Sequence, residues 1–226
     1  MKVSVIIPAA GQSKRFGCKD KKVFHRLKDR PIFIRALELF VNRPDVCQVL
    51  LVVAAEDLET VKERYAASIG FMGVKLAAGG AERTDSVRSG LAQVSAEADF
   101  VCVHDAVRPC VSPLWIDAVF AAAEGCGSAI LACPVQGTLK QVSAEGRVLG
   151  TLARDGLWEA QTPQVFRKDI LLRAYAGAKG PATDDAALVE ALGLPVAIVR
   201  GDPRNIKITT PADLALAEAV VDSLPR

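Results

Sequence analysis

Short runs of β-branched and other apolar residues alternate along the whole chain with stretches of helical periodicity. The apolar runs cover residues 3–7, 49–53, 74–76, 100–104, 129–132 and 196–199, and the helical stretches cover 31–42, 57–67, 83–94, 113–123, 168–177, 184–192 and 211–223. An apolar run without polar alternation predicts a strand that is buried on both faces, which is typical of a parallel sheet covered by helices. The alternation therefore predicts an α/β fold in which helices flank a mostly parallel sheet.

The length of the chain, 226 residues, is enough to build a hydrophobic core without disulfides or a structural metal. No Ser/Gly-rich linker, shift of composition or internal repeat divides it. We therefore expect a single domain that spans residues 1–226.

Residues 137–152 break the alternation of strands and helices. Two short β-type segments flank the turn sequence Ala144-Glu145-Gly146, which predicts a β-hairpin. An isolated two-stranded hairpin is only marginally stable in water. We therefore expect this arm to lie either on its own domain or on a partner subunit.

Charge and cysteine content exclude several classes of protein. The 28 basic and 26 acidic residues leave a net charge of +2, which disfavours a nucleic-acid partner. The longest uncharged stretch, residues 125–139, is too short to span a bilayer, so no membrane partner is expected. Six cysteines without a C-x-x-C pair favour the reducing cytoplasm, and only two histidines disfavour a zinc site.

A basic segment follows the first predicted strand. Residues 9–17 read Ala-Ala-Gly-Gln-Ser-Lys-Arg-Phe-Gly, and Lys19, Lys21 and Lys22 come next. Small residues let the backbone approach a ligand, and the cations suit phosphate groups. The segment matches neither the Walker A nor the G-x-G-x-x-G pattern, and a solvated basic loop is the alternative interpretation.

Three later segments also lie where an open α/β sheet binds ligands, beyond the carboxyl ends of its strands. Gly79-Gly80 opens a predicted helix whose free N–H groups favour an anion, although a plain turn has the same sequence. Asp105 ends a buried strand, where it either pairs with Arg108 or holds Mg²⁺ or a substrate hydroxyl. Lys207 precedes a capped helix and, taken alone, is typical of a surface residue. Together these segments indicate nucleotide binding with transfer at phosphorus, and no G-x-S-x-G elbow supports a serine hydrolase.

Six motifs, spread over nearly the whole chain, resemble those of a known family in order and spacing. They are Ala9-Ala10-Gly11-x-x-x-Arg15, Gly79-Gly80-x-Glu82-Arg83-x-Asp85-Ser86-Val87, Val103-His104-Asp105-Ala106-x-Arg108-Pro109, Thr162-Pro163-Gln164, Thr183-Asp184-Asp185 and Asn205-Ile206-Lys207. The family is the 2-C-methyl-D-erythritol 4-phosphate cytidylyltransferases of the non-mevalonate isoprenoid pathway. The resemblance implies a Rossmann-like fold of the nucleotidyltransferase type A kind, with a β-arm at about 137–152 that clasps a second subunit in a homodimer.

The resemblance also implies a reaction and a set of roles. CTP and methylerythritol phosphate would give CDP-methylerythritol and pyrophosphate, with Mg²⁺ held mainly by CTP phosphates and in possible contact with Asp105. The implied roles are transition-state stabilisation by Arg15 and Lys22, orientation of the attacking phosphate by Arg154 and Lys207, CTP binding by Ala9, Ala10, Gly11, Gly80, Ser86 and Ala106, and substrate binding by Asp105, Arg108, Thr138 and Thr162.

The chain departs from the family pattern at several positions. Lys21-Lys22-Val23-Phe24 stands where the family usually has Pro-Lys-Gln followed by an aromatic residue, so Lys22 is favoured on register and Lys21 or Lys19 are the substitutes. Gly137 replaces an aspartate of the arm, and Ala81 replaces a residue that is often polar. A ribitol 5-phosphate cytidylyltransferase and a non-catalytic nucleotide-binding module are the alternatives. The missing G-x-G-x-x-G disfavours a NAD-dependent dehydrogenase.

Overall fold

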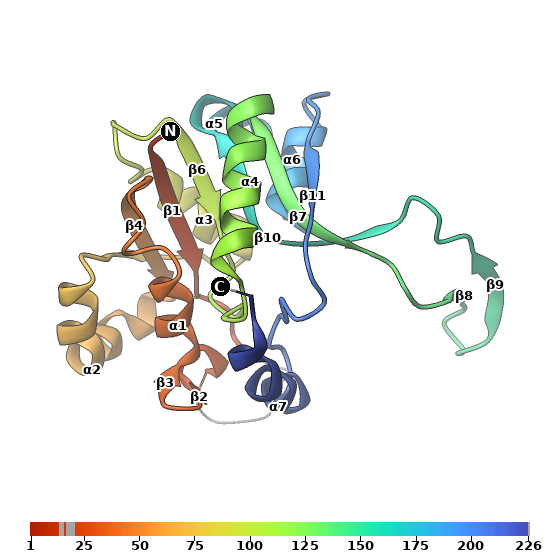
Figure 1. The fold of residues 1–226 in the computed structure, drawn as a ribbon, viewed down its shortest axis with the longest axis horizontal. Helices are drawn as coiled ribbons and strands as arrows, with labels where there is room; N and C mark the ends of the chain where they lie inside the picture. The colour runs from red at the N-terminus through yellow and green to blue at the C-terminus, as the bar shows by residue number, and fades with distance from the viewer. Residues whose placement is uncertain (14–15, 17–20, 226) are drawn as a thin grey trace.

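A seven-stranded sheet forms the centre of the molecule (Figure 1). The computed structural model describes residues 1–13, 16 and 21–225. Across the sheet, the strands follow the order β11 (Ala197–Arg200), β7 (Ser128–Pro134), β10 (Trp158–Arg167), β6 (Phe100–Val103), β1 (Val3–Pro8), β4 (Val46–Val53) and β5 (Lys75–Ala78). All neighbouring pairs are parallel except the two that involve β10. The α/β fold with a mostly parallel sheet is thereby confirmed.

Helices cover both faces of the sheet (Figure 1). The α-helices are α1 (Ile32–Glu38), α2 (Leu58–Phe71), α3 (Arg83–Leu91), α4 (Pro113–Cys126), α5 (Lys168–Gly177), α6 (Asp185–Glu190) and α7 (Pro211–Val220), and the short 3₁₀ turns are η1 (Lys22–Phe24), η2 (Ala55–Asp57) and η3 (Val221–Ser223). Val5 and Ile7 contribute to an apolar cluster that includes residues of α4, whereas Ile6 contributes to the opposite cluster with residues of α3. Because both faces are covered, the strand carries no polar alternation.

Helix packing against the sheet is close at α3. A Cβ atom on Gly90 would lie 2.7 Å from Cγ2 of Ile6, so no larger residue fits there without displacing the Ile6 side chain. This contact fixes α3 against β1 and places the helix N-terminus at the edge of the sheet where β1 and β6 end.

None of the helices in the described part of the chain combines the length and the apolar character needed to cross a bilayer.

The strand β10 was not predicted from the sequence. It runs antiparallel between β6 and β7, and its ladder with β7 is irregular between Ala160 and Gln164. Its segment, WEAQTPQVFR, lacks a continuous apolar run because Gln161, Thr162 and Gln164 are buried polar residues. Hydrogen bonds to distant segments satisfy these side chains, and such partners leave no local periodicity in the sequence.

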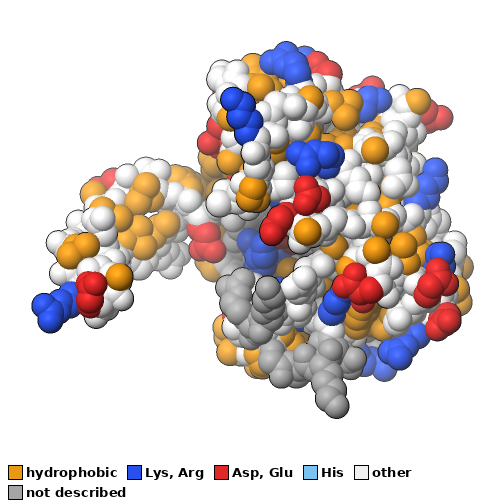
Figure 2. Space-filling view, turned by 180° about the vertical axis from the view of Figure 1, so that it is seen from behind, with side chains coloured by type: hydrophobic (Ala, Val, Ile, Leu, Met, Phe, Trp, Pro, Cys, Tyr) orange, Lys and Arg blue, Asp and Glu red, His pale blue; other side chains and the backbone are white. Residues whose placement is uncertain are grey.

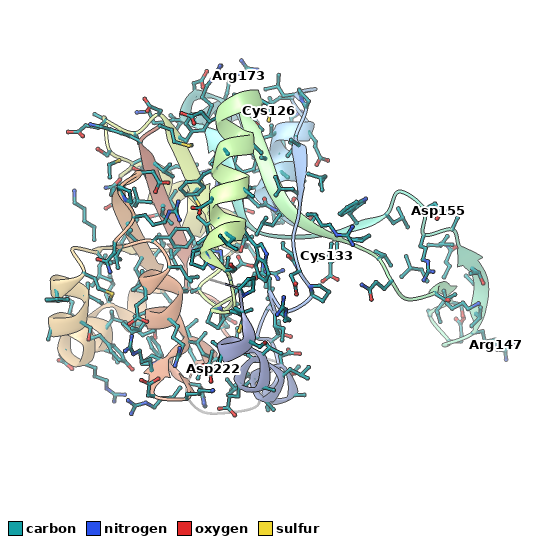
Figure 3. The ribbon with its side chains drawn as sticks, in the orientation of Figure 1. Cys126, Cys133, Arg147, Asp155, Arg173 and Asp222 are labelled. Atoms are coloured by element: carbon teal, nitrogen blue, oxygen red, sulfur yellow. The ribbon has the colours of Figure 1, made fainter. Side chains whose placement is uncertain are left out.

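The predicted hairpin is present as β8 (Leu139–Val142) and β9 (Val148–Leu152), which pair antiparallel in a separate two-stranded sheet. A second small sheet joins β2 (Arg26–Leu27) to β3 (Arg30–Pro31). The arm projects away from the body on extensions of β7 and β10 (Figure 1), so that Arg147 lies far from Cys133, where the arm leaves β7 (Figure 3). Apolar side chains gather on it (Figure 2), and Val148 and Leu149 are 62% and 64% exposed.

Candidate active site

A pocket of about 240 Å³ lies beyond the carboxyl ends of β1 and β6. Five segments of the chain line it: the loop after β1, the turn η1, the start of α3, the segment that carries Asp105 and the segment that carries Lys207. This is the edge at which open α/β sheets bind ligands. The lining contains Ala9, Ala10, Gly11, Lys22, Gly80, Arg83, Ser86, Asp105 and Lys207, so most of the residues predicted from the sequence meet here.

Two loops approach each other closely at the floor of this pocket. Ala9 donates its N–H to the Val52 carbonyl at 2.7 Å, which continues the β1–β4 pairing into the loop. A Cβ atom on Gly79 would lie 2.9 Å from Cβ of Ala10 and 2.6 Å from Oγ of Ser86. Glycine therefore fits position 79, because any side chain there would collide with those of Ala10 and Ser86.

The start of α3 faces the pocket with a capped N-terminus. Glu82 and Asp85 form a reciprocal capping box, and the Ser86 hydroxyl donates to the Glu82 carbonyl at 3.2 Å. The N-terminal end of a helix carries partial positive charge. Arg83, Lys22 and Lys207 add full positive charges to the same wall. The pocket thus suits a polyanionic ligand.

The two candidate lysines of η1 and its flank differ in surroundings. The Lys21 ammonium contacts Glu56 at 2.7 Å and Asp57 at 2.6 Å, and its side chain is only 19% exposed. Burial lowers the pKa of Lys21, but the hydrogen bonds that its ammonium donates to Asp57 and Glu56 outweigh this effect and leave the pKa raised. Lys22 lines the pocket instead. Arg15 and Lys19 lie outside the described residues, and the catalytic role of Lys22 stays a prediction.

Asp105 is the charged centre of the site. Its Oδ1 accepts from Nε of Arg83 at 3.0 Å, and its Oδ2 lies 2.7 Å from Nζ of Lys207 and 3.9 Å from Nε of Arg108. Burial alone would raise the pKa of this carboxyl, but the three cations outweigh it and hold the pKa well below its usual range. A pairing with Arg108 was one of the two interpretations that the sequence left open, and the structure shows that Arg83 and Lys207 are closer to Asp105 than Arg108 is.

His104 and Thr162 hold the loop that carries Asp105. The Arg108 carbonyl can only accept, so Nε2 of His104, at 3.0 Å, carries the hydrogen and Nδ1 is the acceptor. The Thr162 hydroxyl then donates to Nδ1 at 3.1 Å and accepts from the Asp105 N–H at 3.1 Å. Burial lowers the pKa of His104 to about 4, which keeps the ring neutral and this arrangement intact at pH 7.

A second pocket of about 480 Å³ adjoins the first, and Lys207 lines both. Arg108 forms part of its wall and donates from Nη1 to the Asn205 carbonyl at 2.7 Å. Within the described residues, Nε of Arg108 and Oδ1 of Asn205 are buried without a hydrogen-bond partner. Burial lowers the pKa of Arg108 below its ordinary value. Two orphaned polar atoms beside a cavity indicate a site for a polar ligand.

The remaining predicted residues lie away from the first pocket. Ala106 and Thr162 are buried behind its wall, whereas Thr138 and Arg154 are exposed at the base of the arm, where Arg154 donates to the Gln136 carbonyl. Their ligand contacts stay predictions. Sequence reasoning quoted Arg83 in a motif but assigned it no role. Its position at the start of a helix, three residues after Gly80, is the signal that could have identified it.

Within the described residues, no group of three or more His, Cys, Asp and Glu side chains is arranged to hold a metal ion. Asp105 and Glu82 are the carboxylates that line the first pocket. A small hard cation such as Mg²⁺ commonly takes one or two carboxylates together with phosphate oxygens and water. The donors present therefore fit an ion that a bound nucleotide brings with it.

Comparisons with known proteins identify one family. The family model described as 2-C-methyl-D-erythritol 4-phosphate cytidylyltransferase matches residues 3–223. Proteins of that name from Dehalococcoides mccartyi and Syntrophotalea carbinolica are each 43% identical to the chain. The first match covers 97% of this chain and 96% of the relative, and the second covers 99% of this chain and 97% of the relative. The crystal structure of the Thermus thermophilus protein of that name has a TM-score of 0.80 at 36% identity, covering 98% of this chain and 100% of that one.

Proposed function

Because the chain belongs to the 2-C-methyl-D-erythritol 4-phosphate cytidylyltransferase family, we propose that it transfers CMP from CTP to 2-C-methyl-D-erythritol 4-phosphate. The products are CDP-methylerythritol, a precursor in isoprenoid biosynthesis, and pyrophosphate. The observation that carries the proposal is the first pocket, where a small-residue loop, a helix N-terminus and several cations surround Asp105. This combination serves a nucleotide with a negatively charged reaction centre better than it serves a neutral ligand.

The reaction needs no nucleophile from the protein. A phosphate oxygen of methylerythritol phosphate attacks the α-phosphorus of CTP, and the bond from that phosphorus to the β-phosphate oxygen breaks as pyrophosphate leaves. The protein contributes positioning and charge stabilisation. Lys22 lines the pocket from η1 and would stabilise the transition state together with Arg15, which lies outside the described residues. Such a preorganised charge commonly lowers the activation barrier by about 3–4 kcal/mol.

The CTP part of the site is built from small residues. Ala9, Ala10 and Gly11 expose backbone after β1, and Gly80 and Ser86 flank the start of α3. We assign cytosine and ribose to this wall, with Ala106 supporting it from the buried side. Backbone N–H and C=O groups recognise base and sugar without a bulky side chain in the way.

We assign methylerythritol phosphate to the second pocket. Arg108 lines this pocket, Lys207 lines both pockets, and Asp105 lines the first. Arg108 and Asn205 both line this pocket, and each keeps one buried side-chain polar atom without a hydrogen-bond partner among the described residues. Lys207, shared by the two pockets, is suited to hold the attacking phosphate against CTP. Thr162 supports this site indirectly, because its hydroxyl accepts a hydrogen bond from the Asp105 backbone N–H. Thr138 lies at the base of the arm.

We propose that Mg²⁺ accompanies CTP. The ion would be held mainly by triphosphate oxygens and water, with Asp105 as its protein contact. When bound, it supplies charge neutralisation on the triphosphate. Both oxygens of Asp105 already face cations, which lowers the attraction of this single carboxylate for a free metal ion.

We further propose a two-fold homodimer formed through the arm, residues 137–152. The arm is too small to be stable alone, and its exposed apolar side chains, Val142, Val148, Leu149 and Leu152, favour burial against a second subunit. Arg154 lies near its base, away from the first pocket, and a partner's site is where such a residue would act.

The cysteines that the structure describes are free thiols, which supports a cytoplasmic setting.

Pyrophosphate release tests the function. CTP with methylerythritol phosphate should give rapid release, CTP with ribitol 5-phosphate much less, and CTP alone almost none. A polyol that lacks the methyl branch fills the second pocket differently, and a few kcal/mol of lost binding separates the two acceptors. Faster release with ribitol 5-phosphate would replace the proposed acceptor. No acceptor-dependent release from the folded protein would refute transfer altogether.

A further inference from the structure

Behind the pocket wall, a line of hydrogen bonds runs from Asp105 into the interior. Arg83 donates from Nε to Asp105 at 3.0 Å and from Nη2 to Oδ2 of Asp185 at 2.8 Å. The Tyr175 hydroxyl, from α5, donates to Oδ1 of Asp185 at 2.5 Å. We call Tyr175, Asp185, Arg83 and Asp105 the buried network. Only its last member has an assigned role in the reaction proposed above.

The far end of the buried network is held firmly. The Asp185 side chain is 0% exposed, so its charge depends on Arg83 and Tyr175 for compensation. Its backbone N–H donates to Oε1 of Gln164 at 3.1 Å, which ties the start of α6 to β10. Burial, followed by the Asp185 charge, raises the pKa of Tyr175, so the phenol stays protonated and donating.

This anchoring determines which way the Asp105 carboxylate faces. Arg83 holds Oδ1, and the other oxygen, Oδ2, is thereby directed at Lys207 at 2.7 Å. A guanidinium bridges two carboxylates in a rigid fork, which a lysine ammonium does not reproduce. A shift of Arg83 would therefore rotate Asp105 and release Lys207 from its place between the two pockets.

We propose that Tyr175 and Asp185 are positioning residues that act on the polyol phosphate site through Arg83. The inference rests on the proposed function, in which Asp105 and Lys207 receive that substrate. Tyr175 does not line either pocket, and it acts only through the orientation of the groups in front of it. Its loss should then affect the polyol phosphate more than the nucleotide, whose base and ribose are assigned to Ala9–Gly11, Gly80 and Ser86 rather than to Asp105 or Lys207.

The test is Tyr175→Phe, which removes one hydroxyl and keeps the ring. A lost hydrogen bond to a charged group corresponds to about a tenfold effect or more, so we expect KM for methylerythritol phosphate to rise about tenfold. KM for CTP should stay within about twofold, since no contact to the nucleotide is removed. Equal rises in both KM values, or a polyol phosphate KM within twofold of wild type, would overturn the inference.

Tyr65→Phe is the matched control, because it makes the same chemical change elsewhere. The Tyr65 ring packs against Phe24 and Phe33, and its hydroxyl has no hydrogen bond to any residue that the structure describes. Both KM values should be unchanged in this variant. A polyol phosphate KM raised as much as in Tyr175→Phe would show that loss of any tyrosine hydroxyl suffices, which contradicts the buried network.

A second variant, Arg83→Lys, guards against misfolding of Tyr175→Phe. Arg83 is 24% exposed and can be replaced with its charge retained, but the bridge is lost. We expect a similar tenfold rise in KM for the polyol phosphate. Tyr175→Phe added to Arg83→Lys should raise it less than twofold further, because the connection is already broken. If the two substitutions instead raised KM for the polyol phosphate by the product of their separate effects, Tyr175 would not act through Arg83.

The outcome for this inference is separable from that for the proposed function. A wild-type protein that releases no pyrophosphate with methylerythritol phosphate would overturn both. An active wild type with an unchanged polyol phosphate KM in Tyr175→Phe and Arg83→Lys would overturn the positioning role alone.

Discussion

Acidification should destabilise this protein through His104 well before its carboxylates protonate. The ring is fully buried, and its two nitrogens are occupied by the Arg108 carbonyl and the Thr162 hydroxyl. Burial lowers its pKa from 6.5 to about 4 in the folded protein. As the pH falls, His104 therefore takes up a proton near pH 6.5 in the unfolded chain but only near pH 4 in the folded protein.

The direction of the effect follows from this difference. Between the two pKa values the unfolded state holds more protons, so the free energy of unfolding falls as the pH falls. The His104 contribution is complete above pH 6.5 and is lost progressively toward pH 4. At about 1.4 kcal/mol per pH unit, the full loss is about 3 kcal/mol, and about 2 kcal/mol is already lost at pH 5. Asp105, whose pKa is depressed, loses its contribution only below its ordinary value of 3.8, outside this window.

Urea unfolding at pH 7.5 and pH 5 measures the effect. His104→Gln keeps a donor for the Arg108 carbonyl but cannot take up a proton, so it serves as the reference. The wild type should lose about 2 kcal/mol more than His104→Gln between these two pH values. Only the pH dependence is compared, so a constant cost of the substitution cancels. The same dependence in both proteins would refute the reasoning.

Three further predictions concern the reaction. Lys22→Ala should lower kcat for pyrophosphate release about 100- to 1,000-fold while CTP still binds. Lys21→Ala should have a far smaller effect, because the Lys21 ammonium pairs with Glu56 and Asp57. A larger loss of kcat in Lys21→Ala than in Lys22→Ala would reassign the catalytic lysine. Calorimetric titration of Mg²⁺ should show weak binding without CTP, and tight binding would contradict an ion held by the nucleotide. Lys22→Ala and Arg154→Ala chains refolded together should recover about one quarter of wild-type activity, since about half the dimers are mixed and each of these holds one intact site. No recovery, with mixed dimers confirmed by mass, would show that Arg154 serves its own subunit.

Local sequence determined much of the fold and the position of the site. Strands such as β1 and β4 were predictable because both faces are buried, and such strands consist of continuous apolar residues. Helix α7 was predictable because Thr210 and Asp213 form its capping box within one turn. The site could be placed at the carboxyl ends of the strands because chain direction in a parallel sheet brings those ends to one edge.

The tertiary structure alone decided which side chains meet at that site. β10 enters the sheet as an antiparallel strand, although its buried Gln161, Thr162 and Gln164 give no strand-like pattern. Arg83 contacts Asp105 across 22 positions of sequence and Asp185 across 102. Hydrophobic periodicity is a local property, whereas a buried polar group is satisfied by whichever partner the packed chain brings within about 3 Å. The strands could therefore be predicted from local sequence, and the polar contacts of the site could not.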